Sequence, residues 1–242
     1  MVRHGEAMDD QDWMTQLRGA AYRCDRTAVV ALAGDPARPA GVWQLLGEAL
    51  AAALAQRVDG AQQAAARCVV ALRERGWVGD VELADQLDAL AGVRPTPMLR
   101  PLAVDLEQLS DILEGDPMTT GGALDLRTGE VWPRSTIEYL DEGGDDIDTP
   151  DFEDDERFLW VHGEGSRDGY QDMMLFLDTV EDEDRADRLG IALRGRVAFR
   201  RFKDVLARWP GELERWYQLS GERRRGRARA WLADAGYRVA SQ

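Results

Sequence analysis

The chain has 242 residues and a formal net charge of −15, with 44% hydrophobic and 31% charged residues. This length and composition suit a globular protein with a buried core, as one large domain or two small ones. No apolar run approaches the ~20 residues that span a bilayer, and the first residues lack the apolar centre of a secretory signal. The only two cysteines, Cys24 and Cys68, lie in alanine-rich, helix-like segments. We therefore expect a reduced, cytoplasmic protein without a membrane partner.

The first 92 residues show helical patterns and little else. Apolar residues dominate VWQLLGEALAAALAQRV (42–58). The following segment, 61–76, places Ala65, Cys68 and Leu72 on one helical face before a glycine stop. Segment 80–92 repeats leucine at helical spacing before another glycine. These patterns predict a bundle of four or five helices over residues 1–92.

The next stretch, GVRPTPMLRP (92–101), holds three prolines in ten residues. Proline removes a backbone donor and clashes with the preceding helical turn, so a helix cannot continue here. We expect a proline-rich linker at residues 93–101, followed by a second domain over residues 102–242.

Short strands and helices are mixed in the predicted second domain. VDLEQLSDILEG (104–115) predicts a short helix, GGALDLRTGEVWP (121–133) a β-hairpin, and RFLWVHG (157–163) a third strand. From Asp168 the spacing is helical again, with a stop at Pro210-Gly211 and a last helix at about 222–235. The fold class predicted for the whole chain is helix-rich α+β: an all-α bundle followed by a small antiparallel sheet packed by helices.

Two loops carry motifs that resemble ligand sites. Residues 138–156 hold 11 acidic residues and no basic one, including DDIDTPD with Asp146, Asp148 and Asp151. A helix–loop–helix calcium site requires glycine at its sixth position and glutamate at its twelfth, and this segment has neither. GEGSRDG (163–169) fits neither phosphate-loop spacing. We expect a solvated acidic loop, and a turn leading into a helix capped by Asp168.

The chain offers few groups for catalysis. Its only histidines are His4 and His162, and no CxxC, HExxH or paired-histidine motif is present. We therefore expect no metal, no cofactor and no catalytic residue. An enzyme with a carboxylate-centred site near Tyr170 and Asp172 stays open as an alternative.

The segment 194–238 is strongly basic, with 13 arginine or lysine residues against 5 acidic ones. Its aromatic residues fall on apolar helical stripes, which favours core positions and leaves few side chains for stacking on bases. Cations on the other helical faces form most of the candidate partner surface: Arg200, Arg223, Arg225 and Arg229. The candidate surface also includes Tyr170 and Asp172.

Guanidinium groups bind both carboxylates and phosphates, so the arginines alone do not identify a partner. The sequence pI of about 4.6 favours carboxylates, because a polyanion would be repelled by the acidic chain. We expect these arginines to meet acidic surface of the same chain, of a second subunit or of another protein. Nucleic acid is the alternative partner.

The second domain contains four blocks in a fixed order: LDLRTGEVW, DGYQDMMLFLDTV, GRVAFRRFKDVL and RWYQLSGERRRGRARAWLADAGY. Through these blocks residues 102–239 resemble a widespread bacterial family that is described only as uncharacterised. The resemblance implies a shared fold for this part of the chain and assigns no activity to any residue. The functional prediction is therefore a non-enzymatic protein-interaction or regulatory protein.

Overall fold

The computed structural model describes residues 10–143, 150–195 and 197–241. The chain divides into two compact units, one ending at Leu99 and also holding Ser241, the other running from Arg100 to Ala240. Within the described residues, no helix combines the length and the apolar character needed to cross a membrane.

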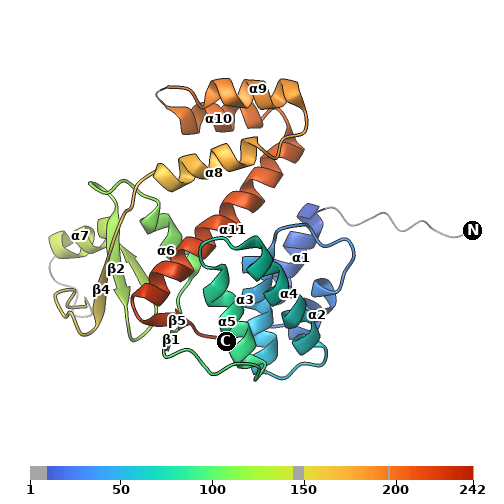
Figure 1. Ribbon diagram of the computed structural model, residues 1–242. Coiled ribbons are helices and arrows are strands. Elements are labelled where there is room, and N and C mark those ends of the chain that lie inside the picture. Colours follow the sequence, from blue (N-terminus) through green and yellow to red (C-terminus); the bar gives the residue numbers. More distant parts are fainter. Residues whose placement is uncertain (1–9, 144–149, 196, 242) are drawn as a thin grey trace, which may run out of the picture. The chain divides into compact units, whose positions relative to one another are not determined.

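The described part of the first unit is a bundle of five helices: α1 (Asp10–Tyr22), α2 (Arg26–Ala33), α3 (Trp43–Ala55), α4 (Ala61–Arg75) and α5 (Asp80–Leu90) (Figure 1). Helix α3 lies at the centre of the bundle, and most of its side chains are buried. A Cβ atom on Gly47 of α3 would lie 2.7 Å from Leu83 Cδ2 of α5, so glycine is what allows these helices to pack so closely.

The second unit contains an antiparallel sheet with the strand order β3-β2-β4, formed by β2 (Gly121–Asp125), β3 (Val131–Pro133) and β4 (Phe158–His162). Helix α6 (Leu106–Leu113) and the C-terminal half of α11 (Pro210–Asp234) share one core with this sheet. Helix α7 (Arg134–Gly143) contributes to a smaller core on the other face. Adjacent residues Leu124 and Ala123 of β2 therefore belong to different cores, as the alternation along a strand requires.

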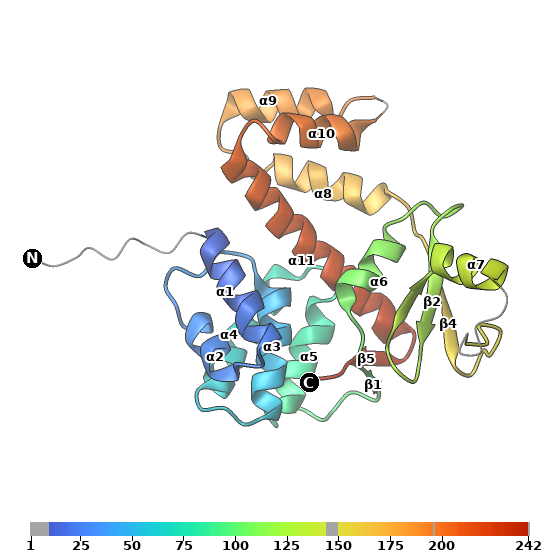
Figure 2. The ribbon, with the colours of Figure 1, turned by 180° about the vertical axis from the view of Figure 1, so that it is seen from behind.

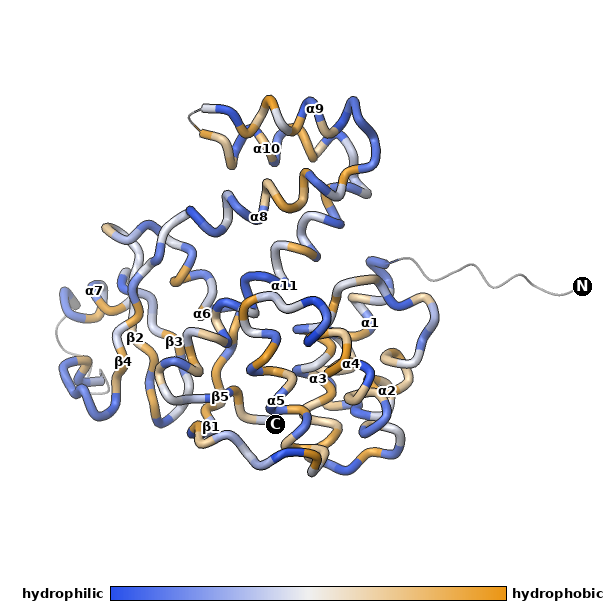
Figure 3. The backbone as a smooth tube through the Cα atoms, in the orientation of Figure 1, coloured by the Kyte–Doolittle hydropathy of each residue, from blue (hydrophilic) through white to orange (hydrophobic). Residues whose placement is uncertain are grey.

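Three further helices pack against the N-terminal half of α11: α8 (Arg167–Leu177), α9 (Glu183–Ala192) and α10 (Ala198–Leu206) (Figure 2). Phe176, Phe202 and Trp216 meet edge to face, with ring centroids 5.1 to 6.1 Å apart. Along α8, α9 and α10 the colouring alternates between hydrophobic and hydrophilic, as expected for helices with one buried face (Figure 3). These contacts, with the sheet and its helices, confirm a helix-rich α+β fold.

Several elements differ from the sequence-based expectation. The last helix starts at Pro210 and runs for 25 residues instead of beginning near residue 222, because Pro210 occupies the first helical turn and the chain continues through Gly221. Helix α7 forms where the acidic loop was expected to begin, because Ile137 and Leu140 give it an apolar face toward the sheet.

The start of α8 also differs, since its N-cap is Ser166 and Asp168 lies in the first turn. A two-stranded parallel sheet was not expected: β1 (Arg100–Leu102) pairs with β5 (Tyr237–Val239). Arg100 and Pro101, assigned to the linker from the sequence, are therefore part of a strand.

Candidate functional site

The arginines of α11 form an ion-pair network with carboxylates of the same unit. Arg223 and Arg227 are four residues apart, so they share one helical face, and both reach Asp172 of α8. Arg227 donates from Nη2 to Asp172 Oδ2 at 2.9 Å and from Nη1 to Oδ1 at 3.2 Å, and Arg223 Nε donates to Oδ1. The Asp172 side chain has no exposed surface. Both oxygens of this buried carboxylate are therefore held by guanidinium groups.

The same arginine cluster also contacts α6. Arg227 pairs with Glu114, which directly follows α6, and Arg224 Nε lies 3.6 Å from the other oxygen of Glu114. Arg225 donates to Glu107 at 3.0 Å. The network therefore fastens α6 and α8 to the middle of α11.

Burial alone would lower the pKa of Arg227, because it disfavours the charged guanidinium. The hydrogen bonds and charges of Asp172 and Glu114 outweigh this effect, so the pKa of Arg227 is raised above its usual value. Asp172 and Glu114 thus favour the charged form of the Arg227 guanidinium.

A second buried carboxylate, Asp125, holds the turn of the LDLRTGEVW hairpin. Its Oδ1 accepts backbone N–H groups of Arg127 and Thr128 at 2.8 and 3.2 Å, and its Oδ2 accepts two N–H groups of Arg157. Burial acts to raise the pKa of Asp125, but these donors and the charge of Arg157 lower it overall. The aspartate of the LDLRTGEVW motif is therefore explained by its structural role in the hairpin turn.

The cations of α10 differ from those of α11. Arg200 and Lys203 are exposed and make no ion pair with any residue that the structure describes. They are three residues apart and so are neighbours on the outer face of the helix, next to Phe199, which is 36% exposed.

Phe199 lies against the start of α8, because a Cβ on Gly169 would lie 3.0 Å from its ring. The next residue, Tyr170, is 39% exposed. We call Tyr170, Phe199, Arg200 and Lys203 the α10 surface.

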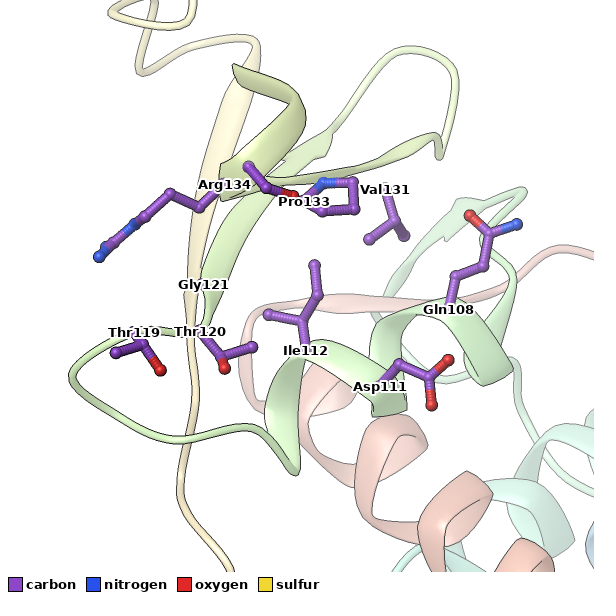
Figure 4. Close-up of a pocket in the computed structure, with 10 residues that line it drawn as sticks. Gln108, Asp111, Ile112, Thr119, Thr120, Gly121, Val131, Pro133 and Arg134 are labelled. Atoms are coloured by element: carbon purple, nitrogen blue, oxygen red, sulfur yellow. The ribbon is translucent and has the colours of Figure 1, made fainter. Parts of the chain in front are cut away.

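A cavity of the second unit lies elsewhere, beside the sheet. It has a volume of about 480 Å³ and lies between α6, the segment before β2, β3 and the start of α7. Ile112, Val131 and Pro133 form its apolar part, and Thr119, Thr120, Arg134 and Gln108 bring polar groups to its edges (Figure 4). None of the residues that the sequence indicated lines this cavity.

A smaller cavity, of about 10 Å³, borders Glu114, Asp168 and Arg227. It leaves no room for a substrate beside the buried network. Among the described residues, no group of three or more His, Cys, Asp or Glu side chains is arranged to hold a metal ion. His4, Asp146 and Asp148 lie outside the described residues.

The structure separates the six residues indicated by the sequence. Arg223 and Asp172 meet in the ion-pair network, Arg225 is bound to α6, and Arg229 is buried. Tyr170 and Arg200 belong to the α10 surface. The acidic partners on α6 were missed, although Glu107, Asp111 and Glu114 recur at helical spacing opposite the leucine face.

Comparison with known proteins places the second unit in a protein family. The sequence model of the uncharacterised protein family UPF0158 matches residues 100–242. UPF0158 protein PA5073 of Pseudomonas aeruginosa is 29% identical over 136 residues, which cover 56% of this chain and 85% of that protein. No solved structure matches the chain.

Proposed function

The chain belongs to the uncharacterised protein family UPF0158, and we propose that it is a non-enzymatic protein-interaction protein whose α10 surface binds an acidic segment of a partner. One observation supports this proposal more than any other. Arg223, Arg225 and Arg227 of α11 pair with carboxylates of their own unit, whereas Arg200 and Lys203 of α10 are exposed without a described counter-ion.

The composition of the α10 surface fits an acidic peptide or protein surface. Arginine and lysine attract carboxylates, and the partly exposed rings of Tyr170 and Phe199 supply apolar contact area of the kind enriched at interfaces. The chain's net charge of −15 weakens attraction to a continuous polyanion but has less effect on a short acidic segment. Nucleic acid is therefore the second candidate.

The enzyme alternative near Tyr170 and Asp172 has less support. Asp172 is buried, both of its oxygens are occupied by arginines, and the cavity beside its partner Arg227 holds only about 10 Å³. A carboxylate in this position is suited to fastening helices together.

The experiment is a binding titration at low and at moderate salt. The probes are a peptide of alternating Asp and Leu, a single-stranded oligonucleotide and a duplex. The double variant Arg200→Glu/Lys203→Glu reverses both charges on the α10 surface. The matched control, Arg18→Glu/Arg67→Glu, makes the same charge change at exposed sites of the first unit.

We expect the acidic peptide to bind the wild type and the control, and to bind the α10 variant at least about tenfold more weakly, as the loss of two charge contacts implies. Equal binding by both variants would refute the proposed site. Tighter binding of either nucleic acid, with a steep salt dependence that the α10 variant abolishes, would favour the nucleic-acid alternative.

A further inference from the structure

Strand β4 is an edge of the three-stranded sheet, and the register shows which of its backbone groups point outward. Leu126 N donates to Arg157 O at 2.7 Å, and Gly163 N donates to Thr120 O at 3.3 Å. Hydrogen-bonded pairs alternate along an antiparallel ladder, so the backbone N–H and C=O groups of Leu159 and Val161 also point toward β2. The backbone groups of the intervening residues, Phe158, Trp160 and His162, therefore point away from the sheet.

Most of these outward groups have no hydrogen-bond partner among the residues that the structure describes. The N–H of Phe158 donates to Asp154 O at 2.8 Å. Trp160 and His162 have no backbone partner on this side among the described residues, and their side chains are exposed. Each of these two residues thus presents one N–H donor and one C=O acceptor, spaced as an added strand requires.

This edge lacks the features that usually prevent strand addition. Natural sheets protect their edges with charged side chains, proline, bulges or very short strands. Strand β4 has the sequence FLWVH, which contains no charge and no proline. The opposite edge, β3, is three residues long and ends at Pro133.

The charges at both ends of β4 indicate the occupant. Asp155 and Glu156 precede the strand and Glu164 follows it, and all three are exposed. In a second copy paired antiparallel about Trp160, Glu164 would lie opposite Glu156, so like charges would meet at both ends. Self-association at this edge is thus disfavoured, whereas an extended segment with basic residues is attracted at both ends.

We propose that the outer edge of β4 binds an extended, basic segment of another protein as an additional strand. Backbone groups of the segment pair with Trp160 and His162, an apolar side chain packs on the Trp160 ring, and flanking lysine or arginine residues lie near Asp155, Glu156 and Glu164. The ligand proposed for the α10 surface is acidic, whereas the segment proposed for β4 is basic. The two proposals rest on different residues, and neither depends on the other.

The test uses the full chain and a labelled peptide of alternating Thr and Val with Lys at both ends. Two N-methylated forms of the peptide carry the methyl groups on alternate residues. Only one form leaves free the amides that face β4 in a given orientation, because successive N–H groups of a strand point to opposite sides. We expect one form to bind like the parent peptide and the other to bind at least about tenfold more weakly.

Hydrogen exchange gives the second readout. The amides of Trp160 and His162 should exchange more slowly in the presence of the peptide, while those of Leu159 and Val161, already paired with β2, should change little. The variant Asp155→Asn/Glu156→Gln/Glu164→Gln should bind more weakly and with a flatter salt dependence. The control Glu183→Gln/Asp184→Asn/Asp187→Asn removes three exposed charges from α9 and should bind like the wild type.

Three results would overturn the proposal. They are equal affinities for the two N-methylated peptides, protection confined to residues outside β4, and absence of peptide binding by the wild-type chain. Concentration-dependent dimerisation that protects Trp160 without peptide would assign the edge to a second copy instead.

Discussion

Asp172 shows how a single buried carboxylate can be explained by its neighbours. It lies on α8, and its partners Arg223 and Arg227 are more than fifty residues later in the chain. Removing its charge leaves two guanidinium groups without their main counter-ion in a largely buried position. Breaking a buried pair from one side destabilises proteins strongly, because the remaining charge is uncompensated.

We therefore predict that Asp172→Asn lowers the free energy of unfolding by about 3 kcal/mol, measured by urea denaturation. The control is Asp111→Asn, because Asp111 pairs with Arg224 in the same network but its side chain is 67% exposed. An exposed pair contributes about 0 to 1 kcal/mol, so the control should change little. An Asp172→Asn protein as stable as the wild type would mean that this carboxylate is not structural, and would revive the enzyme alternative.

The hairpin carboxylate Asp125 gives a prediction for pH dependence. Its pKa in the folded protein is lowered below its ordinary value of 3.8, so the folded state favours the ionised form. The stabilisation is present in full above the unfolded-state pKa and is lost as the pH falls through the lower, folded-state pKa.

The stability difference between wild type and Asp125→Asn should thus stay constant from neutral pH to about 5 and shrink below about 4. Urea unfolding at a series of pH values measures it. A difference that grows on acidification would contradict the assigned pKa direction.

At the scale of elements, the continuity of α11 can be tested at Gly221. A Cβ added there would meet only Arg225 Nη1, at 3.5 Å, an ordinary contact distance. Glycine inside a helix is less favourable than alanine by about 0.5 to 1 kcal/mol, so Gly221→Ala should raise the free energy of unfolding by that amount.

The opposite effect is expected at Gly129, where φ is +81° and a Cβ would lie 2.1 Å from the carbonyl oxygen of Ala103. Gly129→Ala should therefore destabilise the protein. If Gly221→Ala destabilised it as well, α11 would not be a regular helix at this point.

Local patterns predicted most elements and missed those that depend on distant partners. The hairpin and β4 were predicted within one or two residues, because turn residues and strand spacing are local signals. The three-residue strands β1 and β5 were missed, because each is stabilised by the other end of the unit. Helix α7 was missed because the acidic residues on its outer face made the segment look like part of a solvated loop.

At the scale of the whole molecule, the sequence predicted that the basic C-terminal segment would meet carboxylates but not which ones. The run at 138–156 is strongly acidic, yet Arg223, Arg225 and Arg227 of α11 pair with acids of α8 and of α6 with its C-cap. The packing of the helices determines which charged residues become neighbours, and this packing cannot be derived from the amino-acid composition. For the same reason, the distinction between the matched arginines of α11 and the exposed cations of α10 required the structure.

The division into two units leads to the last prediction, that residues 100–240 fold without the first 99. Arg94 is held by Asp85 and Asp88 at the end of α5, whereas Met98 is fully exposed in the segment that precedes β1. The arginines of this segment, Arg94 and Arg100, both precede proline, which blocks trypsin, so a protease of broad specificity is needed. We expect the first cut at residues 95–99.

The boundary itself can be tested with two fragments. One starts at Leu99 and keeps β1, and the other starts at Ala103 and lacks it. The shorter fragment leaves β5 without its partner strand and removes Leu102, which is 4% exposed in the core of this unit. The longer fragment should unfold cooperatively on heating, and the shorter one should have a lower Tm, because it loses both the strand pairing and the apolar burial. Equal Tm values would show that β1 contributes nothing to the unit. A protected segment at residues 95–99, with a first cut inside α11, would contradict the domain boundary.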